Sequence, residues 1–148
     1  MRWNVDIKAE PALHPLLNLI ARTGCWDRVC VGSFSEARVV RAQRLAGPRL
    51  ATSYGTRGVL NLRLRSWGVP AALRGSAVAA QVPETQSGIQ VVDRRFVRAA
   101  HARGLQVHVW TINEADRMHR LLDLGVDGIM TDHIGTLRKV MEERGVWV

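Results

Sequence analysis

The sequence predicts an α/β fold in which short parallel strands alternate with helices. Apolar runs rich in β-branched residues occur six times along the 148 residues, and each is followed by a segment with apolar residues at helical spacing. The connections between these segments are short. Six such βα units require a parallel sheet with right-handed crossovers, and the length suits one domain spanning residues 1–148.

The first half of the chain holds three expected strands, at residues 3–7, 28–34 and 49–54. Pro11 suits the first turn of a helix that ends at Gly24, because proline fixes a helical φ and glycine accepts the left-handed end position. Ser35 is the expected N-cap of a helix running to Leu45. Residues 58–68 form a further expected helix.

The second half holds the other three expected strands, at residues 77–83, 105–112 and 126–131. Residues 84–90 are expected to form a polar loop, and Asp93 to cap a helix that buries Phe96, Val97 and Ala100. Asn113 is the expected N-cap of the next helix, which Gly125 ends. A closing helix is expected at residues 136–144.

Two architectures fit this order: an open, doubly wound sheet and a TIM-type (β/α) barrel. No glycine-rich phosphate loop follows the first strand, which disfavours a dinucleotide-binding fold. Polar residues instead lie at or just beyond the C-terminal ends of several strands: Asp6, Lys8, Ser33, Gln81, Trp110, Asn113 and Asp132. Barrel active sites are built at that end of the strands. The pattern favours an incomplete TIM-type barrel with about six of the eight βα units.

Composition limits the classes of partner. The formal net charge is +8, and Lys8 and Lys139 are the only lysines, so arginine supplies most of the positive charge. These arginines are scattered along helices without interleaved aromatic residues, which indicates solvated faces and no nucleic-acid site. No apolar run is long enough for a transmembrane helix and no secretory signal is visible. We expect a cytoplasmic protein, although a longer parent protein could carry a signal.

Asp6 and Lys8 are the clearest candidates for chemistry. They lie two residues apart on one expected strand, so their side chains point to the same side. In a barrel mouth the carboxylate could ligate a hard divalent cation and the ammonium could neutralise phosphate oxygens. The alternative is a structural ion pair or two exposed residues on an edge strand.

A set of motifs resembles the glycerophosphodiester phosphodiesterase family. The strand WNVDIKAE (residues 3–10) is similar to the family's N-[IV]-[ED]-[IVL]-K strand, and VGSFSEARVVRAQRLAGPRL (residues 31–50) to its following "SF" strand and helix. AAQVPE (residues 79–84) resembles a short strand ending in proline. Residues 92–137 resemble the closing segment, with its V-x-V-W-T-[VI]-N and G-V-D-G-[IV]-x-T-D signatures. These blocks span nearly the whole chain in the family's order.

The resemblance implies metal-assisted hydrolysis of a glycerophosphodiester on a (β/α)₈ barrel, with release of glycerol phosphate and an alcohol. It gives Asp6 the position of a metal-binding carboxylate for calcium or magnesium, often Glu in the family. Lys8 takes the phosphate-binding position, and Trp110 takes that of a pocket aromatic beside the glycerol end of the small-molecule substrate.

The family also opens with an H-R-G strand, then E-N-T, a strand containing E-x-D and a later H-D, and no such series of motifs is found here. We therefore expect no catalytic residue in this chain, because both catalytic histidines and two metal carboxylates belong to those motifs. Of the five histidines, only His133 lies near the expected mouth. A truncated enzyme, with upstream nucleotides encoding the missing motifs, is the first hypothesis. A non-catalytic remnant or pseudoenzyme that binds phosphate or a partner protein is the second. Unpaired edge strands would favour self-association.

Overall fold

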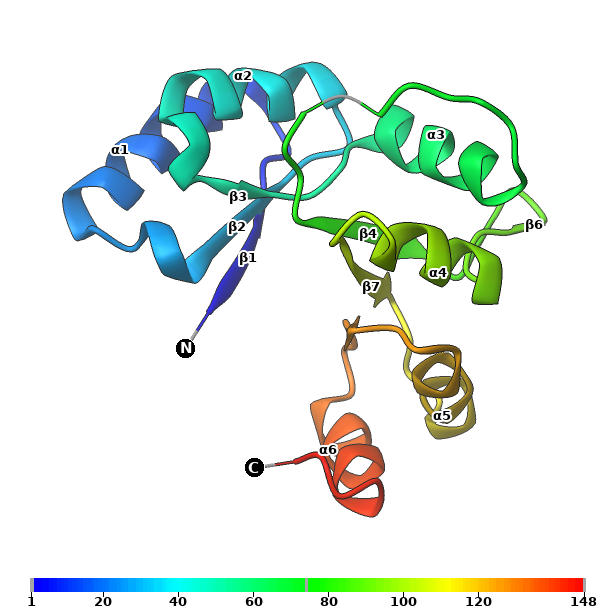
Figure 1. The fold of residues 1–148 in the computed structure, drawn as a ribbon. Coiled ribbons are helices and arrows are strands. Elements are labelled where there is room, and N and C mark those ends of the chain that lie inside the picture. Colours follow the sequence, from blue (N-terminus) through cyan, green and yellow to red (C-terminus); the bar gives the residue numbers. More distant parts are fainter. Residues whose placement is uncertain (1, 74, 148) are drawn as a thin grey trace. The chain divides into compact units, whose positions relative to one another are not determined.

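The computed structural model describes residues 2–73 and 75–147 and confirms an α/β fold (Figure 1). The chain divides into two compact units, Met1–Ala80 and Gln81–Val148. The boundary between the units falls within strand β4 (Ala79–Pro83). Each unit is described below by itself.

The first unit alternates strands and helices in the expected order. Its strands are β1 (Trp3–Asp6), β2 (Val29–Gly32) and β3 (Ala51–Thr52), and its helices are α1 (Leu13–Thr23), α2 (Glu36–Ala46) and α3 (Thr56–Ser66). Short 3₁₀ turns lie at Glu10–Ala12, Trp26–Arg28 and Gly47–Arg49. The strands pair in parallel in the order β1-β2-β3, and an isolated parallel bridge joins Ser53 to Ala79.

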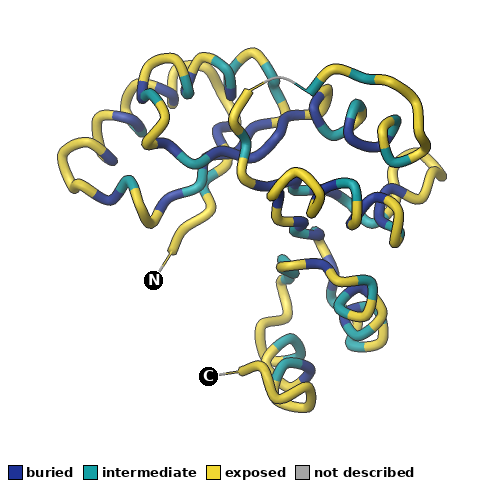
Figure 2. Tube along the Cα trace, in the orientation of Figure 1, coloured by how far each residue is buried: buried dark blue, intermediate teal, exposed yellow. Residues whose placement is uncertain are grey.

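A hydrophobic cluster holds the first unit together on one face of its sheet. Residues from β2, α1 and α2 contribute to it, together with Ile7 just past β1 and the turns before β2 and β3: Ile7, Leu13, Leu17, Ile20, Cys25, Val29, Val31, Ala42, Ala46 and Leu50. The buried segments of α1 and α2 alternate with exposed ones along the chain (Figure 2). Because side chains alternate across a strand, Val5 and Ile7 face this cluster and Asp6 faces the other side.

The second unit contains the clearest strand and the most amphipathic helix. Its elements after β4 are β5 (Thr85–Gln86), β6 (Ile89–Gln90), α4 (Arg94–His101), β7 (Gln106–Trp110), α5 (Ala115–Leu124), β8 (Gly128–Ile129) and α6 (Ile134–Glu143). The strand order is β4-β7-β8, with β7 and β8 parallel. Phe96 and Ala100 of α4 are fully buried beside Val97, as the helical spacing predicts.

Several local expectations about caps and helix ends are confirmed, whereas the expected polar loop at residues 84–90 differs. The Ser35 and Asp93 side chains accept hydrogen bonds from the backbone N–H groups of Arg38 and Phe96, and so cap α2 and α4. Gly24 and Gly125 end α1 and α5 in the left-handed conformation. The polar loop expected at residues 84–90 instead contains a β5–β6 hairpin. Its turn uses Ser87 and Gly88 at positive φ, which lets the chain reverse within two residues.

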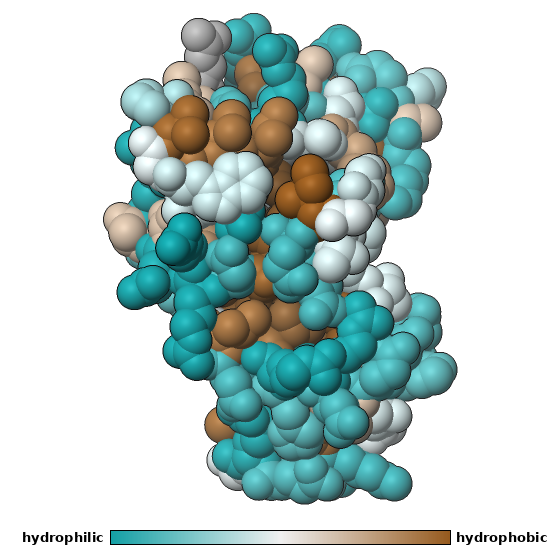
Figure 3. Space-filling model, turned by 90° about the vertical axis from the view of Figure 1, so that its right-hand side faces the viewer, coloured by the Kyte–Doolittle hydropathy of each residue, from teal (hydrophilic) through white to brown (hydrophobic). Residues whose placement is uncertain are grey.

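Hydrophobic side chains reach the surface in several places among polar ones, as one face of the molecule shows (Figure 3). The most exposed large hydrophobic residues include Phe34, Leu60, Ile89 and Ile134. Among the residues that the structure describes, no helix is both long and apolar enough to cross a membrane.

Candidate functional site

Asp6 and Lys8 contact each other at the C-terminal end of β1, as the two-residue spacing predicts. The Lys8 ammonium lies 2.5 Å from Asp6 Oδ2. The Lys8 side chain is 74% exposed and that of Asp6 is 32% exposed. An ion pair this open to water contributes little to stability, because solvent screens it. The pair is therefore a solvent-accessible ion pair and not a buried structural one.

Phe34 is a third member of this group that the residue pattern does not reveal. It lies two residues past the end of β2, its side chain is exposed, and its ring centroid lies 5.2 Å from the Lys8 ammonium. Its backbone carbonyl accepts hydrogen bonds from the Thr56 N–H and hydroxyl groups at the start of α3. We call Asp6, Lys8 and Phe34 the β1 site. Phe34 is part of the "SF" motif in the sequence, but that motif does not predict that Phe34 contacts Lys8.

The donor set of Lys8 suits an anionic ligand. An ammonium has three N–H donors, and the contact with Asp6 uses one of them. The other two could bind phosphate oxygens while the ion pair with Asp6 stays intact. The Phe34 ring adds an apolar surface beside the Lys8 ammonium.

The described residues do not form a cation site by themselves. Magnesium and calcium require about six or more oxygen ligands, and Asp6 offers one carboxylate, which already contacts Lys8. No group of three or more His, Cys, Asp or Glu side chains suited to a metal occurs within residues 2–73 and 75–147. Any cation at Asp6 would need its remaining ligands from outside this set.

Glu84, the carboxylate that follows β4, is committed to an ion pair. Arg117 of α5 donates to Glu84 Oε2 through both Nε and Nη2, at 2.9 and 2.6 Å. This hydrogen bond is the largest cause that raises the pKa of Arg117 above its ordinary value. The Glu84 backbone carbonyl also accepts from Val91 and Val92. Glu84 therefore has a structural part in the second unit.

Trp110 ends β7 and is half-buried. Val107 and Val109 of the same strand are fully buried, so Trp110 and His108 lie on the opposite face. Burial lowers the pKa of His108, and the charge of Asp127 opposes that shift. His108 is thus disposed to be neutral at physiological pH.

His108 packs against Gly128, its partner across the β7–β8 ladder. A Cβ atom at position 128 would lie 2.8 Å from His108 Cδ2, closer than side-chain atoms approach. His108 is therefore packed against its neighbour on the adjacent strand. His133, by contrast, is exposed at the start of α6 and makes no side-chain cap there.

The expectation that Asn113 caps a helix is wrong. The N-cap of α5 is Glu114, whose side chain makes no capping hydrogen bond. Asn113 Oδ1 instead accepts from the Thr131 hydroxyl at 2.9 Å and from the Asp132 N–H at 3.0 Å. We call these three residues the Asn113 brace. The Asn113 brace joins the segment after β7 to the segment after β8. Asn113 does not cap α5 because its side-chain oxygen is used by Thr131, a partner 18 residues away.

Replacing Asn113 with alanine is expected to loosen residues 131–133. The loss leaves the Thr131 hydroxyl and the Asp132 N–H without their acceptor, at a cost of about 1 kcal/mol because water can partly replace it. Amide hydrogen exchange of Asp132 should become faster. Asn113→Asp is the control, since it keeps the acceptor oxygen and should exchange as the wild type does. Equal exchange in the two variants would contradict the brace.

The comparison with protein families decides the assignment. The model of the glycerophosphoryl diester phosphodiesterase family matches residues 1–136. The chain belongs to this family. A Mycobacterium tuberculosis protein named "Probable glycerophosphodiester phosphodiesterase 2" is 43% identical over 99% of the chain, which covers 57% of that relative.

Solved structures agree on the fold. A Silicibacter pomeroyi protein assigned to the glycerophosphoryl diester phosphodiesterases matches 99% of the chain with a TM-score of 0.75 and 23% identity, and the chain covers 52% of it. An Oleispira antarctica phosphodiesterase, solved with the product sn-glycerol-3-phosphate, matches 96% of the chain with a TM-score of 0.67 and 17% identity. The chain covers 56% of that structure. It thus spans about half the length of these relatives.

Proposed function

We propose that this chain is part of the barrel of a glycerophosphodiester phosphodiesterase, a phosphoric diester hydrolase that releases glycerol phosphate and an alcohol. Family membership over residues 1–136 supports the reaction class. The parallel pairing of β1 with β2, β2 with β3 and β7 with β8 supports an incomplete TIM-type barrel of about six βα units. We treat residues 1–148 as one partial family domain.

The β1 site is the observation that carries this proposal. Lys8 would bind phosphate oxygens through the two donors that Asp6 does not use, and so stabilise the negative charge that builds up during attack on phosphorus. Asp6 would orient Lys8 and supply one oxygen ligand to a divalent cation, calcium or magnesium. Such a cation would polarise the phosphate when bound. Trp110, half-buried at the end of β7, would pack against the glycerol end of the substrate.

Proton transfer is expected to need groups that this chain does not supply. The H-R-G and H-D motifs, which hold the family's two catalytic histidines, are not found in the sequence. His101 of α4 is paired with Asp127, His119 of α5 with Glu143, and His108 packs against Gly128. The chain would therefore bind the phosphate end of the substrate without hydrolysing it. A non-catalytic phosphate-binding protein is the second candidate, and the same site supports it.

The edge of the first sheet supports self-association. Within the described residues β1 pairs with β2 alone, so β1 is an edge strand of its sheet. Further barrel strands or a second copy of the chain could add to the sheet at that edge.

Binding of sn-glycerol 3-phosphate to the 148-residue chain tests the proposal. Titration followed by NMR should shift the signals of Lys8 and Phe34. Lys8→Met should weaken binding about 10- to 100-fold, since a hydrogen bond to a charged group contributes roughly 1.5–3 kcal/mol. Lys139→Met is a matched control, because Lys139 is the only other lysine and lies exposed on α6.

Equal affinity in the two lysine variants would contradict the assignment of Lys8. A separate assay uses glycerophosphocholine and calcium as substrate and cofactor. Turnover comparable to that of a full-length relative would contradict the expected lack of catalytic histidines.

A further inference from the structure

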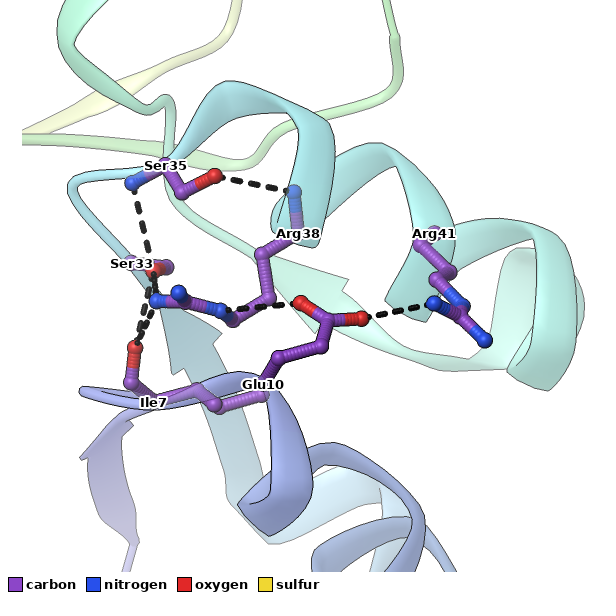
Figure 4. A network of polar contacts seen from close by, with 6 residues as sticks. All are labelled: Ile7, Glu10, Ser33, Ser35, Arg38 and Arg41. Carbon is purple, nitrogen blue, oxygen red and sulfur yellow. Dashed lines mark hydrogen bonds and ion pairs between the residues drawn. The ribbon is translucent and has the colours of Figure 1, made fainter.

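A polar network links the C-terminal ends of β1 and β2, next in sequence to the residues of the β1 site (Figure 4). Its centre is the backbone carbonyl oxygen of Ile7, the residue between Asp6 and Lys8. That oxygen accepts from the Ser33 hydroxyl at 2.8 Å and from Arg38 Nη1, also at 2.8 Å. A carbonyl oxygen has two lone pairs, so these two donors saturate it.

Arg38 is the residue that ties this network together. Its Nη1 also donates to the Ser33 hydroxyl oxygen at 2.8 Å, and its Nε donates to Glu10 Oε2 at 3.3 Å. The other oxygen of Glu10 accepts from Arg41 at 2.8 Å. The Arg38 side chain is only 17% exposed, although arginine is usually an exposed residue. Its guanidinium is therefore fixed on both sides, by Ile7 and Ser33 on one and by Glu10 on the other.

Ile7 lies at the point where the pairing of β1 with β2 ends, directly before Lys8. The last backbone hydrogen bond of the β1–β2 ladder runs from the Ile7 N–H to the Gly32 carbonyl, at 2.8 Å. Lys8 lies one residue beyond that bond, where the strand pairing has ended. The Ile7 carbonyl belongs to the same planar peptide unit as the Lys8 N–H. Fixing this oxygen therefore fixes the positions of the Lys8 N and Cα atoms, from which the Lys8 side chain extends.

We propose that Arg38 is a positioning residue for the β1 site. By holding the Ile7–Lys8 peptide, it sets the position of Lys8 beside Asp6 and Phe34. Its importance for ligand binding rests on the proposed function of Lys8. Arg38 acts through Ile7, because its Nη1 donates to the Ile7 carbonyl oxygen while its Nε is held by Glu10.

Three variants of the full chain test this role. Arg38→Met removes the guanidinium and keeps most of the aliphatic stem, and Arg38→Lys restores the charge and one donor group. Arg44→Met is the matched control, because it removes the same charge from the same helix. Arg44 is exposed and makes no polar side-chain contact among the described residues. If Arg38→Met does not fold, Arg38→Lys carries the test alone.

The first measurement needs no ligand. The backbone ¹⁵N order parameter of Lys8 should fall from about 0.85, typical of rigid backbone, towards about 0.6 in Arg38→Met. It should be intermediate in Arg38→Lys and unchanged in Arg44→Met, while Val31 in the core stays rigid in all three. A purely structural role would loosen Val31 together with Lys8. An unchanged order parameter at Lys8 overturns the inference.

The second measurement is the affinity for sn-glycerol 3-phosphate, which should fall about three- to tenfold in Arg38→Met, recover partly in Arg38→Lys and stay at the wild-type value in Arg44→Met. Undiminished affinity in Arg38→Met overturns the inference even if Lys8 becomes mobile. If the wild-type chain does not bind the ligand, the proposed role of Lys8 fails. The order parameter alone then decides whether Arg38 positions that residue.

Discussion

Replacing Phe96 with alanine is expected to lower the free energy of unfolding by about 3–5 kcal/mol. Phe96 is fully buried, and its backbone N–H is held by the Asp93 cap of α4 at 2.8 Å. Truncation removes apolar surface from the core and leaves a cavity that rigid neighbours only partly fill. A loss of that size approaches the whole stability of a small domain. Denaturant unfolding, followed with amide hydrogen exchange in residues 81–147, measures it.

The chain offers a matched control, because Phe34 is its only other phenylalanine and is 61% exposed. Phe34→Ala removes the same atoms without opening a cavity, and loses the contact with Lys8. Its cost should stay within about 1 kcal/mol, the value of an exposed cation–π contact. Similar losses in the two variants would show that Phe96 is not part of a packed core.

Gly58→Ala is expected to destabilise the first unit, although alanine is normally the better residue in a helix. A Cβ atom at position 58 would lie 2.4 Å from Tyr54 Cδ1 and 2.9 Å from Tyr54 Cβ. Tyr54 is buried, so its ring has little room to move. Overpacking of this kind costs about 1–3 kcal/mol, more than the gain of up to about 1 kcal/mol in helix propensity.

Gly135 in α6 is the control for this change, since no atom lies within 4 Å of its would-be Cβ. Gly135→Ala should therefore raise the thermal unfolding midpoint, while Gly58→Ala should lower it. The opposite signs distinguish a steric clash from a general effect of glycine in helices. A rise in both variants would contradict the contact between Gly58 and Tyr54.

Periodicity predicted the order of strands and helices well, because each element's apolar face depends on residues close together in the chain. Element boundaries were less predictable. The strand expected at residues 49–54 is reduced to Ala51–Thr52, because Gly47–Arg49 forms a 3₁₀ turn and Ser53 makes only a single bridge. The hairpin at residues 85–90 was missed because its two strands are exposed and have no apolar alternation.

In the candidate site, too, contacts between residues close in sequence could be predicted and contacts between distant residues could not. The contact between Asp6 and Lys8 follows from the two-residue period of a strand, so the sequence could predict it. The contact of Arg38 with Ile7 spans 31 positions, and that of Asn113 with Thr131 spans 18. Such pairings depend on how strands align after folding. Local preference therefore assigned Asn113 to a cap and gave no reason to single out Arg38 among the many arginines.

The close packing of Gly128 under the His108 ring makes these two positions interdependent. A methyl group at position 128 would meet the imidazole, so a larger residue there requires a smaller one at position 108. Among related chains the two positions should covary, and their summed side-chain volume should stay nearly constant. The second glycine of the G-V-D-G signature thus reflects the size of a neighbour on the adjacent strand, whereas Gly125, at the start of the same signature, reflects a left-handed backbone.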